Sequence, residues 1–260
     1  MCGIAGGIWV QPELALEEPI LKRMADVLVH RGPDDEGTYR SDFQLRPPYE
    51  AIPGIALASK RLSVIDLATG HQPVSNEDGT IWAVQNGEIY NYRDLRQRLE
   101  GAGHKFQSQS DTETLVHLYE DEGVDFVQHL TGMFAIAIWD VARRRLVLAR
   151  DRLGQKPLIY REEPGRLLFA SQLKSLLEVP GIPKTVDPAA IDEYLTYQYV
   201  PHPNTIFAGC RKLPPAHVAV YCDGTLKIDR YWQPVVSPAG QPAWGHGAND
   251  HDYYGELRQR

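Results

Sequence analysis

A cysteine at the second position of the chain is the residue whose placement most directly indicates chemistry. The sequence opens Met-Cys-Gly-Ile-Ala-Gly, and only Cys210 and Cys222 follow among 260 residues. Removal of Met1 would leave a thiol and an α-amino group on the same residue. An amine with a pKa near ~8 can accept the thiol proton without a histidine. Cys2 is therefore a candidate nucleophile with its own base, although a buried cysteine in an edge strand fits these residues equally well.

The other cysteines and the histidines suggest neither a disulfide framework nor a metal site. An odd number of cysteines favours free thiols, so Cys210 and Cys222 are expected to be reduced and structural. None of the nine histidines lies at metal-ligand spacing from a cysteine or carboxylate partner. The prediction is therefore that the chain has no metal site.

Composition excludes several classes of partner. With 43% hydrophobic and 23% charged residues, the chain can bury a globular core. Its net charge is -7 and its basic residues are scattered, which argues against a nucleic-acid partner. No apolar run approaches the ~18 residues of a membrane span, and the N-terminus lacks signal-peptide features. We therefore expect a cytoplasmic protein with no membrane partner.

The hydrophobic pattern predicts a mixture of strands and helices that would position Cys2. Apolar runs predict strands at 4–10, 54–66, 81–91, 133–140, 145–151, 157–161 and 166–171. Helical periodicity predicts helices at 17–30, 92–103, 110–123, 172–178 and 188–197, the third opening with a Ser110-x-x-Glu113 capping box. Without strict alternation of the two element types, the pattern indicates an α+β fold.

The run from 133 to 151 also indicates how the sheet is covered. It has the form of a hairpin, and side chains of alternate residues of a strand point to opposite faces. Both faces of its first strand are apolar, so the sheet should be packed on both sides; the two sets are Phe134, Ile136 and Ile138, and Ala135, Ala137 and Trp139.

Three further segments have distinct compositions. The Pro-rich stretch 40–57 is expected to form a surface loop. Residues 216–232 predict a β-ribbon that turns at Asp223-Gly224. Residues 233–252 lack periodicity and are rich in Pro, Gly and Asn, and the final YYGELRQR (253–260) has the pattern of the first turns of a helix. Residues 233–260 are therefore predicted to be a linker and the truncated start of another domain.

Several motifs in a fixed order make a family resemblance specific. They are MCGIAG, HRGPD (30–34), RLSVID (61–66), NGEIYN (86–91), SDTE (110–113), GMFAIAIWD (132–140) and RDRLGQKPLIY (150–160). Together they resemble the class II glutamine amidotransferase domain of glutamine-hydrolysing asparagine synthetases, over residues 2–232. The resemblance implies an N-terminal nucleophile (Ntn) hydrolase fold, a four-layer αββα sandwich of two antiparallel sheets.

The resemblance implies a role for residues at the reacting end of a glutamine site. Cys2 matches the nucleophile, and the Asn86 amide and the Gly87 backbone N–H match the donors of an oxyanion hole. Arg31 matches an arginine that orders the entrance and the N-terminus, in a supporting role. Two alternatives stay open: Asn86-Gly87 as a hairpin turn, and Arg31 as an ordinary surface residue.

Three charged residues match the part of the family site that binds the amino-acid end of glutamine. Arg61 corresponds to the residue that grips the α-carboxylate, where a guanidinium offers two parallel donors. Asp111 corresponds to the partner of the α-ammonium, and Glu88 lies beside the same pocket. Asp111 could instead cap the following helix unless Ser110 does so, and Glu88 could be a solvated strand residue.

The resemblance implies hydrolysis of glutamine to glutamate and ammonia, with no cofactor. The ammonia would serve asparagine synthesis from aspartate by a synthetase domain, in the same chain or another, that needs ATP and Mg²⁺. The Ser-Gly-Gly-x-Asp-Ser pyrophosphate motif of that domain does not occur here. Homo-oligomerisation is also possible. Two alternatives remain: a non-catalytic regulatory or interaction module, and a glutaminase that serves another amide-forming synthetase.

Overall fold

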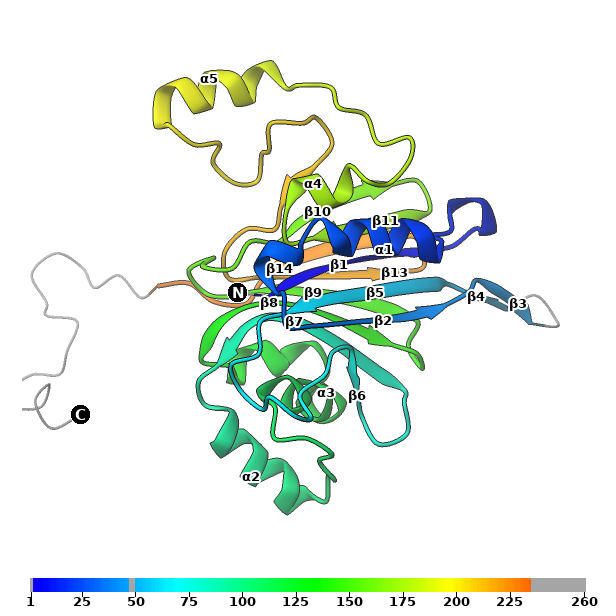
Figure 1. The fold of residues 1–260 in the computed structure, drawn as a ribbon, viewed down its shortest axis with the longest axis vertical. Coiled ribbons are helices and arrows are strands. Elements are labelled where there is room, and N and C mark those ends of the chain that lie inside the picture. The colour runs from blue at the N-terminus through cyan, green and yellow to red at the C-terminus, as the bar shows by residue number, and fades with distance from the viewer. Residues whose placement is uncertain (1, 47–49, 235–260) are drawn as a thin grey trace, which may run out of the picture.

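Two antiparallel six-stranded sheets, packed face to face, form the centre of the molecule (Figure 1). The computed structural model describes residues 2–46 and 50–234. The first sheet has the order β12-β10-β11-β1-β5-β2, and the second β14-β13-β9-β8-β7-β6. The first comprises β1 (Gly3–Trp9), β2 (Asp35–Ser41), β5 (Gly54–Arg61), β10 (Ile159–Glu163), β11 (Arg166–Ala170) and β12 (Arg211–Lys212).

In the second sheet β7, β8 and β9 pair in chain order: β8 and β9 form a hairpin, whereas residues 90–131 with two helices connect β7 to β8. The ribbon predicted at 216–232 joins this sheet through β13, which pairs with β9. The strands are β6 (Val74–Ser75), β7 (Ile81–Ile89), β8 (Gly132–Asp140), β9 (Arg145–Arg150), β13 (His217–Cys222) and β14 (Thr225–Arg230).

Helices cover the outer face of each sheet, so the predicted four-layer αββα sandwich is confirmed. Leu21, Met24 and Leu28 pack in a core with the outer face of the first sheet, and Leu115, Leu118 and Tyr119 do so with the second. The helices are α1 (Glu18–Asp26), α2 (Tyr92–Ala102), α3 (Asp111–Glu122), α4 (Leu173–Leu176) and α5 (Pro188–Tyr197), with 3-10 turns at Pro12–Leu14, Val29–Arg31 and Gly123–His129.

The alternation predicted for β8 is the clearest link between sequence and layers. Phe134, Ile136 and Ile138 lie in the core beneath α2 and α3. Ala135, Ala137 and Trp139 lie in the core between the sheets. Both faces of the strand are buried because helices cover one and the other sheet covers the second.

The structure differs from the sequence predictions at three points. The strand expected at 54–66 ends at Arg61, and residues 62–73 form a loop. Strand β2, which the apolar pattern did not predict, pairs with β5 along its edge. Part of the 40–57 stretch is a two-stranded ribbon rather than an irregular loop, since β3 (Gln44–Arg46) pairs with β4 (Glu50–Ile52).

Residues 235–260 lie outside the described part of the chain, and with them most of the predicted linker and the start of a following domain. Within residues 2–46 and 50–234, no helix has the length and apolar character needed to cross a bilayer.

Candidate active site

The predicted site residues come together where both sheets meet the start of α3. Cys2 directly precedes β1, and the neighbouring strand β5 ends at Arg61. The opposite sheet contributes Glu88 from β7, and α3 begins at Asp111. A small cavity is lined by Cys2, Arg61, Gly87, Glu88 and Asp111 together with loop residues. Strand pairing and helix packing therefore join residues that lie more than a hundred positions apart.

The Cys2 side chain is buried against the first residue after β5. The backbone N–H of Leu62 donates to Cys2 Sγ at 3.4 Å, and the thiol faces Leu62 O at 3.7 Å. Burial raises the pKa of the Cys2 thiol, and the Leu62 contact opposes that rise. The thiol therefore rests protonated and needs a base before it can act as a nucleophile.

The backbone carbonyl of Cys2 is held by two side chains that the sequence singled out. Arg31 Nε donates to it at 2.9 Å. The buried Asn86 amide donates through Nδ2 to the same oxygen at 2.8 Å, while its Oδ1 accepts from Arg31 Nη2 at 3.3 Å. This network excludes the reading of Arg31 as an ordinary surface residue. Asn86 retains a second amide hydrogen for another acceptor.

Gly87 lies within a strand, so the hairpin-turn alternative for Asn86-Gly87 is wrong. It lies two residues before the end of β7 and pairs with Phe134 of β8. Its φ is +152°, and a Cβ added here would lie 2.0 Å from Met133 O. Only glycine fits this close approach, and its presence allows the backbone beside Asn86 to border the cavity.

The Arg61 guanidinium is buried and is oriented by the loop that follows it. Its Nη2 donates to Ile65 O at 2.6 Å and to Asp66 O at 2.7 Å. A Cβ on Gly70 would lie 2.4 Å from the same nitrogen, so the loop closes around the guanidinium only with glycine at that position. Arg61 is the cationic side of the cavity.

Glu88 and Asp111 form the anionic side of the cavity. Burial raises the pKa of Glu88 to about 7, and the neighbouring Asp111 charge adds to this rise. Burial also raises the pKa of Asp111, although Ile89 N donates to its Oδ2 at 2.8 Å and Gln85 Nε2 at 3.2 Å. Two carboxyl groups so disposed favour the arrival of a cation between them.

At the start of α3, one residue caps the helix and the next one supplies the charge that borders the cavity. Ser110 caps the helix, its Oγ accepting from Thr112 N at 3.0 Å. The capping alternative for Asp111 is therefore wrong. The capping box is also only half formed, because Glu113 accepts from Gln107 N and Ser108 N instead of Ser110 N.

The loop after Arg61 almost closes the cavity. The volume is about 10 Å³, the space of one water molecule. Asp66 anchors this loop by accepting from Thr69 N at 2.9 Å and from Gln109 N at 2.7 Å. Partial burial raises the pKa of Asp66, but these hydrogen bonds outweigh it and lower the pKa to about 2. A larger ligand can enter only if residues 62–69 move.

Two residues near the site received no role from the sequence. Gln72 is buried and links three elements. Its Oε1 accepts from Gln85 N of β7 at 2.7 Å and from Ser59 Oγ of β5 at 3.4 Å, and its Nε2 donates to Thr112 Oγ1 of α3 at 3.0 Å. Lys156 is buried, and its charge lowers the pKa of Glu88 against the effects of burial and Asp111. Lys156 lies in the RDRLGQKPLIY motif, whereas no local pattern marked Gln72.

The family model and the most similar curated proteins agree on the family of this chain. The model of a family described as the glutamine amidotransferase domain matches residues 1–232. Glutamine-hydrolyzing asparagine synthetase 3 of Bacillus subtilis (strain 168) is 38% identical over 235 residues, which are 89% of this chain and 36% of that protein. Asparagine synthetase 2 of the same organism is 45% identical over 186 residues, 71% of this chain and 23% of that protein. The chain thus spans about a third or less of these relatives.

A solved structure supports the fold alone. Glutamine phosphoribosylpyrophosphate amidotransferase from Bacillus subtilis superposes with a TM-score of 0.56 at 20% identity, covering 89% of this chain and half of that one.

Proposed function

Because this chain belongs to the glutamine amidotransferase domain family, we propose that it hydrolyses the side-chain amide of glutamine with Cys2 as nucleophile. One observation supports this most strongly: the Cys2 thiol, the Arg61 guanidinium and the Glu88 and Asp111 carboxyl groups border one cavity. A thiol at one end and opposite charges at the other suit an amino acid with a reactive side chain. The same grouping argues against a purely regulatory module.

The reaction begins with a proton transfer within one residue. After Met1 is removed, the α-amine of Cys2 accepts the thiol proton, and the thiolate attacks the amide carbon of glutamine. A C–S bond forms and the carbonyl oxygen becomes an oxyanion, stabilised by the free N–H of the Asn86 amide and the Gly87 N–H. The ammonium returns its proton to the leaving nitrogen as the C–N bond breaks.

The second half of the reaction restores the enzyme. Ammonia departs and leaves a γ-glutamyl thioester on Cys2. Water, deprotonated by the α-amine, adds to the thioester, and glutamate leaves as the C–S bond breaks and the thiol regains its proton. The balance is one glutamine and one water consumed for one glutamate and one ammonia.

The charged end of the cavity orients the substrate. Arg61 would exchange its contacts with Ile65 O and Asp66 O for the α-carboxylate of glutamine. The α-ammonium would lie between Asp111 and Glu88, where burial has left the carboxyl groups in need of a cation. Opening of residues 62–69 would admit the substrate, and closure would exclude water.

The ammonia would serve asparagine synthesis from aspartate, the activity in the names of the relatives described above. We assign ATP and Mg²⁺ to a synthetase domain, in the same chain or a separate one. Residues 1–232 would be the complete glutaminase, with 233–260 leading to the next domain. We place the protein in the cytoplasm, since Cys2, Cys210 and Cys222 are free thiols.

The test begins with the N-terminus of the protein. Mass spectrometry establishes whether Met1 is absent, and an assay of glutamate release from glutamine then measures the activity of that form. We expect one glutamate and one ammonia per glutamine from the processed chain. Correctly folded, processed protein that releases neither would refute the proposal.

A further inference from the structure

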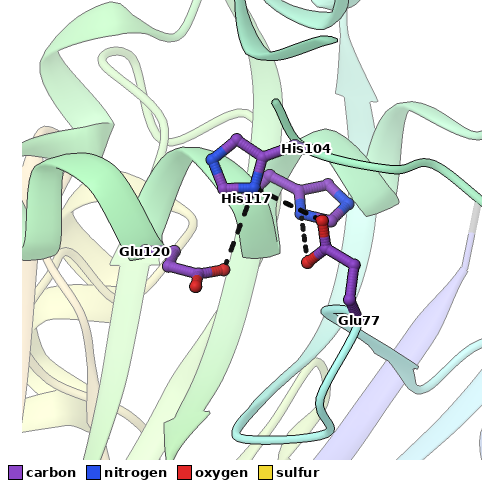
Figure 2. A group of neighbouring side chains, drawn as sticks. All are labelled: Glu77, His104, His117 and Glu120. Atoms are coloured by element: carbon purple, nitrogen blue, oxygen red, sulfur yellow. Dashed lines mark ion pairs between the residues drawn. The ribbon is translucent and has the colours of Figure 1, made fainter. Parts of the chain in front are cut away.

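A second cluster of titratable side chains lies away from the Cys2 cavity. Glu77 comes from the turn between β6 and β7, His104 follows α2, and His117 and Glu120 belong to α3 (Figure 2). One nitrogen or oxygen atom from each residue lies within 4.8 Å of the corresponding atoms of the other three. Four potential metal ligands from three segments thus converge on one point.

His117 is the least satisfied member of the cluster. It is 0% exposed, and neither ring nitrogen has a hydrogen-bond partner. Buried polar atoms are nearly always paired, because desolvation without a partner is costly. A buried imidazole that faces carboxylate oxygens without bonding to them indicates a missing ligand.

The shortest distance inside the cluster matches the ligand spacing around a bound cation, and the others are longer. His117 Nδ1 lies 3.3 Å from Glu77 Oε2, and His104 Nδ1 lies 3.6 Å from Glu77 Oε1 and 4.0 Å from Glu120 Oε2. Two ligands at about 2.0–2.1 Å from a tetrahedral zinc ion stand roughly 3.4 Å apart. The widest separations, up to 4.8 Å, would have to close by about 1.4 Å, which rotation of the exposed Glu77 and Glu120 side chains can supply.

The other ring nitrogen of each histidine points at an outer carboxylate. His104 Nε2 lies 3.1 Å from Asp121 Oδ1, and His117 Nε2 lies 3.7 Å from Glu113 Oε1. Metal-bound histidines commonly direct their second N–H to a carboxylate, which fixes the tautomer and strengthens the ligand. Both histidines therefore offer Nδ1 to the cluster in the manner of metal ligands.

The charge of the cluster suits a divalent cation. Four carboxylates surround the two imidazoles: Glu77, Glu113, Glu120 and Asp121. A divalent cation would offset half of the negative charge of these four carboxylates and would give both Nδ1 atoms a partner.

We propose that Glu77, His104, His117 and Glu120 bind a Zn²⁺ ion. Two imidazole nitrogens and two carboxylate oxygens suit a tetrahedral first-row cation, whereas Mg²⁺ and Ca²⁺ prefer sites made of oxygen. The sequence pattern predicted no metal site, because the ligands are dispersed over 44 positions from 77 to 120. The ion joins the β6–β7 turn and the segment before α3 to that helix, which also carries Asp111.

The experiment uses the whole chain in a Cys2→Ser, Cys222→Ser background, which removes the N-terminal thiol and the half-buried thiol as competing ligands and leaves only the buried Cys210. Isothermal titration of metal-free protein with Zn²⁺ should show one site, and the melting temperature should rise by several degrees. Co²⁺ should give the intense visible absorption of a tetrahedral complex, and Mg²⁺ should give no response. His104→Ala should weaken Zn²⁺ binding by about 100-fold or more, and Asp121→Asn, outside the ligand set, by about 10- to 100-fold.

The control is His129→Ala, which removes another histidine beside a carboxylate, 3.6 Å from Glu122, outside the cluster. This variant should bind Zn²⁺ like the parent. His104 is largely buried but not at the centre, so its variant should fold, as circular dichroism will verify. Absence of a stoichiometric Zn²⁺ site, or equal binding by the folded His104→Ala variant and the parent, would overturn the proposal.

Discussion

The two ends of the Cys2 cavity are prepared for their tasks in opposite ways. At the reacting end, the Cys2 carbonyl already has fixed partners in Arg31 and Asn86. At the recognition end, Glu88 and Asp111 have raised pKa values because burial outweighs the nearby cations Lys156 and Arg61 at Glu88 and the hydrogen bonds to Asp111. One end is held by protein contacts, and the other needs the substrate to complete it.

This difference separates two kinds of defect. Damage to the reacting end should lower kcat, because fixed donors act on the charge that develops in the transition state. Damage to the recognition end should raise KM, because the interaction with the amino-acid end exists before and during the reaction. The cavity can therefore be divided by kinetics.

The largest effect is expected for Cys2→Ala. Loss of the nucleophile should reduce glutamate release by at least about 10⁴-fold. Because Arg61, Glu88 and Asp111 are untouched, glutamine should bind with an affinity within severalfold of the parent, as calorimetry would measure. Activity within tenfold of the parent would show that Cys2 is not the nucleophile.

The next largest effect is expected for Asn86→Ala. Removal of one oxyanion donor should lower kcat by about 10²- to 10³-fold and leave KM within about threefold. Steady-state glutaminase kinetics separate the two parameters. Asn204→Ala is the matched control, since it removes an asparagine that hydrogen-bonds to Glu193 far from Cys2, and it should behave like the parent. A change confined to KM would move Asn86 to the recognition end.

Asp111→Asn should raise KM for glutamine by roughly 10- to 100-fold, the value of about 1.5–3 kcal/mol for a charged hydrogen bond. The asparagine oxygen can still accept from Ile89 N, so the start of α3 should keep its structure. A 10- to 100-fold fall in kcat with an unchanged KM would contradict the assignment of Asp111 to the recognition end.

The smallest effect is the pH dependence that Glu88 contributes. Its folded pKa of about 7 predicts that KM rises by about tenfold as the pH falls from 8 to 6. Over this range the Glu88 carboxylate, which contacts the α-ammonium of glutamine, becomes protonated and neutral. Glu88→Gln should raise KM at pH 8 and abolish this dependence. A parental KM that stays constant between pH 8 and 6 would exclude the role.

The same carboxyl group affects stability with a defined sign. Glu88 has a raised pKa in the folded protein. Its contribution to the free energy of unfolding is therefore complete below its unfolded pKa of about 4.3 and is lost as the pH rises through about 7. Glu88→Gln should therefore raise the melting temperature at pH 8 relative to the parent and leave it nearly unchanged at pH 4.

Much of the fold was predictable because strand alternation and helical periodicity are local. The opposite faces of β8 indicated a sheet covered on both sides, and the motif order indicated the family. Strand β2 escaped because its sequence, DEGTYRS, is polar and lies at a sheet edge. The predicted strand at 54–66 was too long, because the apolar residues of 62–66 are largely exposed in a loop and not paired in the sheet.

The site was only partly predictable for a different reason. Residue types and motifs pointed to seven residues. Five of them line one cavity, namely Cys2, Arg61, Gly87, Glu88 and Asp111. The other two, Arg31 and Asn86, bind the backbone carbonyl of Cys2. No pattern pointed to Gln72, whose three partners come from different elements. Convergence of distant side chains depends on the packing of whole layers.

The sequence by itself determined most element types, the family and the candidate residues for amide chemistry, because these depend on local order and residue identity. Tertiary structure alone decided which groups lose water, and therefore the raised pKa values of Glu88 and Asp111. It also brought Glu77, His104, His117 and Glu120 together. Desolvation and convergence are properties of the packed layers, since each arises from residues that the chain order keeps far apart.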